Sequence, residues 1–412
     1  MGHSYAASPG CSSGERPLGC GWDAARSLAV NEGSVMSPGA TGSTGTKSSG
    51  PGSAAIEEYL DELWRRGGTD LLLTSGAPPL LRIDGQIEQY DAPALTDSSV
   101  QKMVGSVLGD DLRQKFDQSG EIDFSFTWGD SARLRGNAFR QRGTHALAIR
   151  MIPFRIPNLD ELAIPSAVRD MIERPHGLIL VTGPTGSGKS TTLAAMIDHI
   201  NQTRACHIVT IEDPIEYVHA HKRSAVSQRE IGQDSASFES ALRAVLREDP
   251  DVVLIGEMRD PESIQAALTI AETGHLVLAT LHTNDSGQAV DRIVDVFPAE
   301  RRAQVQVQLA HVLTGVVYQR LVPRIGGGLV AAFEIMAGIH PVRNLIREGK
   351  TRQLRNVVAT HRDSGMQTLE ASLEKLIGEG LITHEAAMAA SLFPREIRAG
   401  APSVVPIAVA QR

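Results

Sequence analysis

Cysteine, aromatic residues and long apolar runs are all scarce in this sequence. The odd number and wide spacing of its three cysteines, Cys11, Cys20 and Cys206, fit neither a disulfide framework nor a zinc site, so a reducing cytoplasm is the simplest compartment. Aromatic residues make up 4% of the chain, which disfavours stacking platforms for single-stranded nucleic acid. No apolar run approaches the ~18 residues of a membrane-spanning helix. Any membrane attachment is therefore expected to go through partner proteins.

Basic residues are in the minority as well. The chain has 40 Lys and Arg against 48 Asp and Glu, which gives a net charge of −8. Proteins that hold nucleic acid usually present a basic face, because neutralising phosphates supplies most of their affinity. We therefore expect no nucleic-acid partner. The 42% hydrophobic and 21% charged content is typical of a globular protein, and 412 residues allow two or three domains.

The composition changes along the chain and divides it into five segments. Residues 1–52 are rich in Gly, Ser, Thr and Pro and are predicted to be a disordered tail, unless Met36 is the true start. The other expected segments are a small α+β domain at 53–152, a proline-marked linker at 153–165, an α/β domain at 166–395 and a flexible tail at 396–412.

Short elements are expected throughout residues 53–152. Helical spacing of apolar residues predicts helices at 56–64 and 97–108. Alternation and turn signals predict strands at 70–74, 80–83, 122–128, 133–139 and 146–152. The second half of this domain is dense in arginine, with Arg133, Arg135, Arg140, Arg142 and Arg150.

From residue 166 strands alternate with helices, which predicts a parallel sheet with helical crossovers. The expected strands are 177–182, 207–211, 251–255 and 275–281. The expected helices are 189–201, 238–247 and 261–273. After Arg301 the chain is predicted to be mostly helical, interrupted by a hairpin at 324–328.

A phosphate-binding loop is the first motif that carries chemistry. The segment GPTGSGKS at 183–190 matches G-x-x-x-x-G-K-[ST] between an apolar strand and a helix-forming run, which is the context this motif requires. Its glycines let backbone N–H groups surround phosphates at the positive end of a helix, while Lys189 reaches the β- and γ-phosphates and the Ser190 hydroxyl coordinates Mg²⁺. The sequence therefore predicts an enzyme that binds MgATP and hydrolyses it. The predicted nucleotide-binding residues are Gly183, Pro184, Thr185, Gly186, Ser187, Gly188, Lys189, Ser190 and Thr191.

Acidic residues follow two further predicted strands. Glu257 comes after strand 251–255, where a P-loop sheet carries a carboxylate beside the metal. Glu212, Asp213 and Glu216 come at the end of strand 207–211. One of these three could polarise the attacking water, but the residues alone do not choose among them.

Two histidines flank the strand at 275–281. His282 ends this strand, where ligands lie in such sheets. For His275 two readings stay open, because it could hydrogen-bond the γ-phosphate or be a structural histidine with no role in the chemistry.

Taken in order, these four elements resemble the Walker A, Walker B, Asp-box (TIEDPIEYVH) and His-box (ETGHLVLATLHTND) motifs of the secretion-type ATPases that power type IV pili and type II secretion. The resemblance spans about 56–382 and includes DRIVDVFPAE at 291–300 and GMQTLE at 365–370. Within that family PVRNLIRE at 341–348 resembles a helix of pilus-retraction ATPases. No cysteine follows Cys206, so the four-cysteine zinc element of extension ATPases is absent.

The resemblance implies a RecA-like P-loop ATPase domain with a parallel-sheet core, preceded by a small PAS-like α+β domain. It implies that Glu216 is the catalytic glutamate, that Glu257 lies near Mg²⁺ and that His282 lies near the phosphates. Three arginines of the small domain would reach nucleotide at a domain or subunit interface: Arg135, Arg142 and Arg150. The implied assembly is a cytoplasmic homohexamer that acts on an inner-membrane platform protein and hydrolyses ATP to drive pilus retraction and twitching motility.

Other functions are considered beside this one. The missing cysteines and the short N-terminal part disfavour an extension or secretion ATPase of the same superfamily, whereas an accessory retraction paralogue stays open, as do the pilus system and the hexamer's symmetry. A RecA-like DNA motor would require a basic groove and salt-sensitive DNA binding. A nucleotide-binding regulator without turnover is disfavoured by the acidic residues at 212, 213, 216 and 257.

Overall fold

A computed structural model of the protein describes residues 51–83, 85–129, 132–153 and 155–398, all within the unit Thr41–Arg412. The predicted tails at 1–52 and 396–412 fall almost wholly outside these residues, and their disorder stays a prediction.

Antiparallel pairing builds the first of two sheets, in the order β3-β2-β1-β6-β5-β4. Every expected strand of the small domain is present, and β3 and α3 are additional to the prediction. The elements are α1 (Pro51–Arg65), β1 (Asp70–Thr74), β2 (Leu80–Ile83), β3 (Gln86–Gln89), α2 (Asp97–Val107), α3 (Asp110–Ser119), β4 (Glu121–Trp128), β5 (Ala132–Gln141) and β6 (Thr144–Pro153).

One face of this sheet is buried against its helices. In β1 the buried residues Leu71 and Leu73 alternate with half-buried ones, as period-two side-chain placement requires. They share one hydrophobic core with Leu60 of α1 and Val100 of α2. This is the small α+β domain that the sequence predicts.

The second sheet has seven strands in the order β13-β12-β7-β11-β10-β8-β9, and only β12 and β13 pair antiparallel. Up to its last parallel strand, the elements are α4 (Ser166–Ile172), β7 (Gly177–Thr182), α5 (Lys189–Thr203), β8 (His207–Glu212), β9 (Ala225–Glu230), α6 (Phe238–Val245), β10 (Val252–Ile255), α7 (Pro261–Glu272) and β11 (Leu276–Leu281). The remainder are α8 (Ser286–Asp295), α9 (Ala299–Val312), β12 (Leu313–Pro323), β13 (Leu329–Ala337), α10 (His340–Arg347), α11 (Leu354–Thr360), α12 (Leu369–Gly378) and α13 (His384–Ala390).

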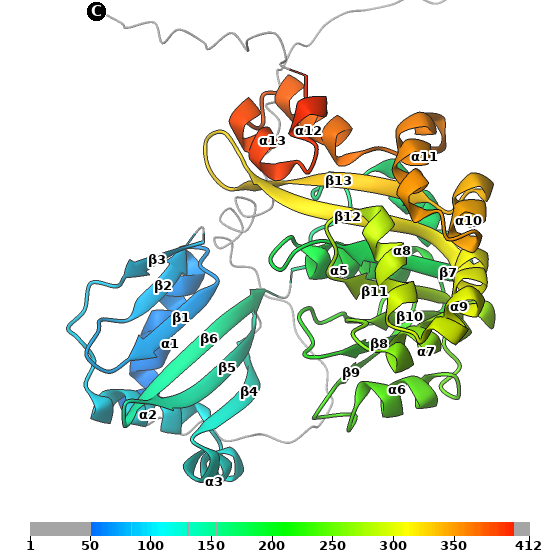
Figure 1. The fold of residues 1–412 in the computed structure, drawn as a ribbon. Coiled ribbons are helices and arrows are strands. Elements are labelled where there is room, and N and C mark those ends of the chain that lie inside the picture. Colours follow the sequence, from blue (N-terminus) through cyan, green and yellow to red (C-terminus); the bar gives the residue numbers. More distant parts are fainter. Residues whose placement is uncertain (1–50, 84, 130–131, 154, 399–412) are drawn as a thin grey trace, which may run out of the picture. The chain divides into compact units, whose positions relative to one another are not determined.

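Helices cover both faces of this second sheet (Figure 1). In β7, Leu178 and Leu180 join the core formed with α6 to α11, while Ile179 and Val181 join the core formed with α4 and α5. Every residue of β7 is buried, because both of its faces are covered. This is the parallel sheet with helical crossovers that the alternating pattern predicts, with one antiparallel strand added at its edge.

The prediction of a mostly helical chain after Arg301, interrupted by a hairpin at 324–328, is confirmed, but the length of the two hairpin strands was not predicted. Two long strands, β12 and β13, occupy 313–323 and 329–337 and extend the sheet beyond β7. The first seven residues of β12 are all buried. A fully buried strand has no period-two alternation, so its apolar run cannot be distinguished from a buried helix by periodicity.

Among the described residues, no helix combines the length and apolar character needed to cross a membrane. The last helices instead pack onto the hairpin. Leu369 and Leu373 of α12 share a core with Tyr318 and Val322 of β12. Figure 1 shows α12 and α13 beside the β12–β13 hairpin.

A buried histidine on the loop after β8 makes stability depend on pH. Burial lowers the pKa of His219 from 6.5 to about 4, although Asp198 opposes the shift. Between these values the unfolded chain binds a proton that the folded chain does not. The stabilisation is therefore complete above pH 6.5 and is lost as pH falls towards 4, with a total of about 3 kcal/mol.

We expect the His219→Asn variant to lack this part of the pH dependence, because asparagine does not titrate. Urea unfolding at pH 7, 6 and 5 should show the difference in free energy of unfolding between the two proteins changing by about 0.7 kcal/mol from pH 7 to 6 and by about 1.2 kcal/mol from pH 6 to 5. The exposed His340 supplies the matched His340→Asn control. A difference between wild type and His219→Asn that stays constant with pH would contradict this prediction.

Candidate nucleotide site

Four loops with polar side chains leave the same edge of the second sheet. They follow β7, β11, β10 and β8, which are adjacent and parallel, so their carboxyl ends lie together. The loops carry the phosphate loop at 183–190, His282, Glu257, and the acidic segment at 212–216. The fold thus brings the four sequence motifs to one place.

The phosphate loop is wrapped around its own lysine. The Lys189 ammonium donates to the carbonyl oxygens of Gly183 at 2.9 Å and Pro184 at 3.0 Å. Burial lowers the pKa of Lys189, and the nearby Glu257 and Glu216 carboxylates oppose that shift. A partly desolvated ammonium beside the N-terminus of α5 is well suited to contact phosphate oxygens.

A glutamine on β12 supports this loop and was missed by the sequence analysis. The buried Gln319 donates to the Ser187 carbonyl at 2.7 Å and accepts from the Thr192 hydroxyl at 2.6 Å. A Cβ placed on Gly188, whose φ is +84°, would lie 2.9 Å from the Gln319 amide nitrogen. No motif could reveal this contact, because it joins residues that are 132 positions apart.

His282 lies between the loop lysine and the carboxylate after β10. Its Nδ1 is 3.4 Å from the Lys189 ammonium, and its Nε2 is 3.4 Å from Glu257 Oε1. An ammonium can only donate, so Nδ1 accepts and the ring proton is on Nε2, facing the carboxylate. The three side chains therefore form a chain of polar contacts along the sheet edge.

Glu257 is held as a carboxylate. Arg259 donates to it at 2.8 Å, and this hydrogen bond is the main reason that the pKa of Glu257 lies below its ordinary value. His282 lowers the pKa further, whereas partial burial opposes the shift. A negative charge is thus maintained at the end of β10.

The structure separates the three acidic residues after β8. Glu212 accepts from the Thr210 hydroxyl at 2.6 Å and from the Gln228 amide at 3.2 Å, and burial raises its pKa. Asp213 is exposed. The half-buried Glu216 carboxylate forms no hydrogen bond within the described chain, and its charge acts on Lys189. Of the two glutamates in this segment, Glu216 is thus the one whose carboxylate has no hydrogen bond among the described residues, and the exposed Asp213 carboxylate has none either.

Other predicted site residues lie elsewhere. His275 precedes β11 at the opposite end from His282, and its Nδ1 lies 3.0 Å from the Ile270 carbonyl near the end of α7, which favours the reading of His275 as a structural residue. Arg150 is paired with Asp70 at 2.8 Å, and Arg142 lies in the turn between β5 and β6. Within the described residues, no hydrogen bond or ion pair joins Arg135, Arg142 or Arg150 to the phosphate loop.

The residues at this edge of the second sheet fit a nucleoside triphosphate. The Ser187 hydroxyl is buried without a hydrogen-bond partner in the described chain, and a Cβ on Gly186 would meet open space. The half-buried Ser190 is the second residue of α5, and its hydroxyl has no hydrogen-bond partner among the described residues. Thr191 is joined to Tyr217 of the Asp-box loop at 2.8 Å, which ties the phosphate loop to the acidic segment.

Comparison with known proteins agrees with this geometry. The sequence profile of the family described as "Type II/IV secretion system protein" matches residues 82–374. The chain is 46% identical to the "Type IV pilus retractation ATPase PilT" of Pseudomonas aeruginosa over 82% of this chain and 98% of that protein. It is 50% identical to a "Twitching motility protein" of Neisseria gonorrhoeae over 75% of this chain and 83% of that one.

A solved structure shows the same fold with a nucleotide. It is described as the crystal structure of the pilus retraction motor PilT and bound ADP, and it superimposes with a TM-score of 0.77 at 50% identity. The match covers 83% of this chain and 98% of that one. The fold of this chain is thus similar to that of a protein whose structure was solved with bound ADP.

Proposed function

The chain belongs to the type II/IV secretion system protein family, and from this premise we propose that it is an ATP-hydrolysing motor of type IV pilus retraction. ATP hydrolysis is supported above all by the contact of Lys189 with His282, and of His282 with Glu257, at the edge where Glu216 also lies. Retraction is supported by the similarity to PilT along almost the whole of that relative.

Nucleotide binding begins at the phosphate loop. The N–H groups of 183–191 hold the phosphates, and the Lys189 ammonium exchanges the carbonyls of Gly183 and Pro184 for β- and γ-phosphate oxygens. Mg²⁺, when bound, neutralises charge that develops on these oxygens, and Ser190 and Glu257 are the residues that would hold it.

Hydrolysis then requires a base for the attacking water. Glu216 takes a proton from the water as the water oxygen bonds to the γ-phosphorus and the bond to the β-phosphate oxygen breaks, which releases ADP and phosphate. The two ring nitrogens of His282 contact Lys189 and Glu257, so His282 would couple the presence of the γ-phosphate at Lys189 to Glu257.

The proposed assembly completes the site. In a homohexamer, Arg135, Arg142 and Arg150 are the small-domain arginines that would stabilise charge on the γ-phosphate from a domain or subunit interface. Cationic groups supplied in this way raise turnover by about 10³-fold or more in other phosphoryl-transfer enzymes. The motor would lie at the cytoplasmic side of the inner membrane and act on a pilus platform protein, without a nucleic-acid partner.

Deletion of the gene tests the retraction assignment. We expect loss of surface motility together with accumulation of surface pili, because assembled filaments could no longer be withdrawn. Re-expression of the wild-type chain should restore motility, whereas the Lys189→Ala variant should not. Loss of pili on deletion would instead identify an extension motor, and unchanged motility and piliation would contradict the proposal.

A further inference from the structure

A buried glutamate of β9 lies beside the acidic segment and has no role in the proposed chemistry. Glu230 ends β9 and is paired in register with Glu212, the last residue of the neighbouring β8. Only 5% of Glu230 is exposed. Because β8 and β9 are parallel, its side chain lies at the same sheet edge as the four loops of the site.

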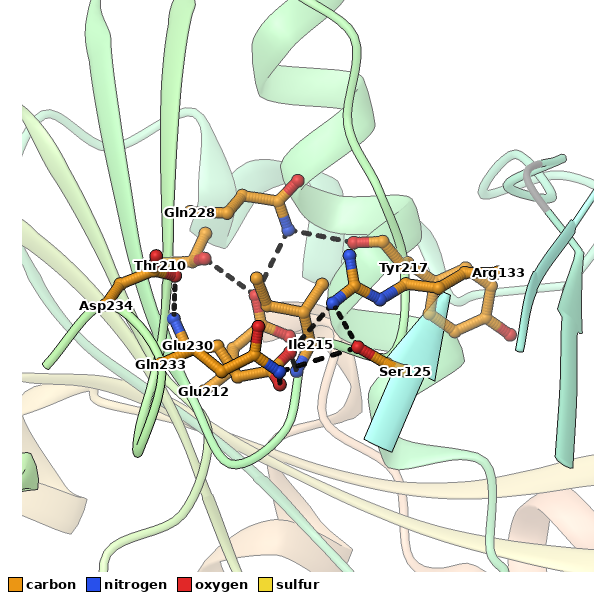
Figure 2. Close-up of polar contacts among 10 residues, drawn as sticks. All are labelled: Ser125, Arg133, Thr210, Glu212, Ile215, Tyr217, Gln228, Glu230, Gln233 and Asp234. Atoms are coloured by element: carbon orange, nitrogen blue, oxygen red, sulfur yellow. Dashed lines mark hydrogen bonds and ion pairs between the residues drawn. The ribbon is translucent and has the colours of Figure 1, made fainter. Parts of the chain in front are cut away.

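Glu230 holds a backbone amide of the Asp-box loop. The Ile215 N–H donates to Glu230 Oε2 at 3.2 Å, and Ile215 immediately precedes Glu216. Figure 2 shows Glu230 and Glu212 near Ile215. A buried carboxylate thus helps to determine where the backbone runs immediately before Glu216.

A guanidinium of the first sheet compensates the charge of Glu230. Arg133 of β5 donates from one nitrogen, Nη2, to Glu230 Oε2 at 3.2 Å and to the Ser125 hydroxyl of β4 at 2.9 Å (Figure 2). The Gln233 amide donates to the other oxygen of Glu230 and lies 3.5 Å from the same hydroxyl. A carboxylate this deeply buried is costly without such partners.

Glu230 Oε2 is therefore shared between a donor in the loop after β8 and a donor on β5 of the first sheet. One is the amide that precedes Glu216, and the other is a side chain of the small domain. General-base catalysis depends on placing the base within hydrogen-bond reach of the water, and a displacement of about 1 Å can cost roughly 10²-fold in rate. Glu230 Oε2, which accepts the hydrogen bond from Arg133, thus also contributes to the placement of Glu216.

We propose that Glu230 is a positioning residue that sets Glu216 for hydrolysis, and that Arg133 is the small-domain group that maintains it. A movement of β5 that withdraws Arg133 leaves an uncompensated carboxylate beside Ile215, so turnover depends on the position of the small domain. This inference rests on the proposed role of Glu216 as the base.

The test uses the full chain with Glu230→Gln, which keeps the shape of the side chain and removes its charge. We expect kcat for ATP to fall about tenfold or more, while the Kd for a fluorescent ATP analogue and the number of sites bound per chain stay unchanged. Arg133→Gln should lower kcat in the same direction, and the double variant should be no slower than Glu230→Gln alone.

Single-turnover phosphate release in the Glu216→Gln background separates positioning from a general loss of structure. There Glu230→Gln should cause no further decrease, because the group it positions is gone. A further decrease of similar size, or a reduced number of binding sites, would overturn the inference. Glu239 and Arg243, an exposed ion pair on α6, supply the matched Glu239→Gln and Arg243→Gln controls, which should stay within about twofold of wild type.

The remaining outcomes separate the inference from its premise. Normal kcat in Glu230→Gln together with an inactive Glu216→Gln would overturn the role of Glu230 alone. Normal kcat in Arg133→Gln would overturn the dependence on the small domain. Full turnover in Glu216→Gln would overturn the assignment of the base, and the positioning role with it.

Discussion

Replacing Lys189 by alanine is expected to lower steady-state ATP hydrolysis by at least about 10³-fold, the largest effect predicted for this chain. The variant loses the ammonium that the loop carbonyls now hold within reach of the phosphate site. It also loses the charge that balances Glu257 and Glu216, so two carboxylates would face the triphosphate without a cation from this loop.

Phosphate release and nucleotide binding should be measured together for this variant. Hydrolysis should fall below detection, and ATP affinity should fall as well, because the lost contact is made in both the ground state and the transition state. The exposed Lys375, which is 3.8 Å from Glu379 on α12, offers a matched Lys375→Ala control that should keep wild-type turnover. Retained hydrolysis in Lys189→Ala would contradict the whole interpretation of this sheet edge.

The Glu216→Gln variant is expected to lower kcat by about 10²- to 10⁴-fold with little change in ATP affinity. Glutamine keeps the size of the side chain but cannot accept a proton from water at neutral pH. The Glu216 carboxylate forms no hydrogen bond in the described chain, so its replacement should disturb little else. Loss of kcat without loss of binding is the signature of a group that acts in the chemical step.

A variant of the neighbouring carboxylate Asp213 tests whether the effect is specific to Glu216. Asp213 is exposed, and Asp213→Asn should change kcat only a few-fold. Single-turnover phosphate release and binding of a fluorescent ATP analogue should be measured for both Asp213→Asn and Glu216→Gln under the same conditions. A greater loss in Asp213→Asn than in Glu216→Gln would show that the base has been assigned to the wrong residue.

Local signals were sufficient wherever a strand or helix is marked by its own residues. The strand 177–182 and the glycine-rich loop after it were predictable, because both the apolar run and the motif are contiguous. The hairpin turn at 324–328 was predictable as well, but the extent of the long strands β12 and β13 was not, since burial on both faces removes the alternation that identifies a strand. The strand β9 was missed for another reason, namely that AVSQRE has a weak apolar pattern.

The roles of the acidic residues needed tertiary contacts. Glu212 and Glu216 are four positions apart and chemically identical, yet Gln228 and Thr210 engage the first and leave the second free. Gln319 and Glu230 carry no motif, and each acts through residues distant in sequence or on another strand. Hydrogen bonds of this kind depend on which strands become neighbours, which no local pattern encodes.

The sequence by itself determined that this protein has a phosphate loop, in which order its acidic and histidine motifs follow, and that these motifs lie in an α/β region preceded by a small α+β region. It could do so because backbone conformation and side-chain periodicity are local properties of a chain. Only the tertiary structure decided that Glu212 is held by hydrogen bonds while Glu216 is not, how His282 is shared between Lys189 and Glu257, and that Arg133 reaches the strand beside the site. These are consequences of burial and of contacts between distant segments.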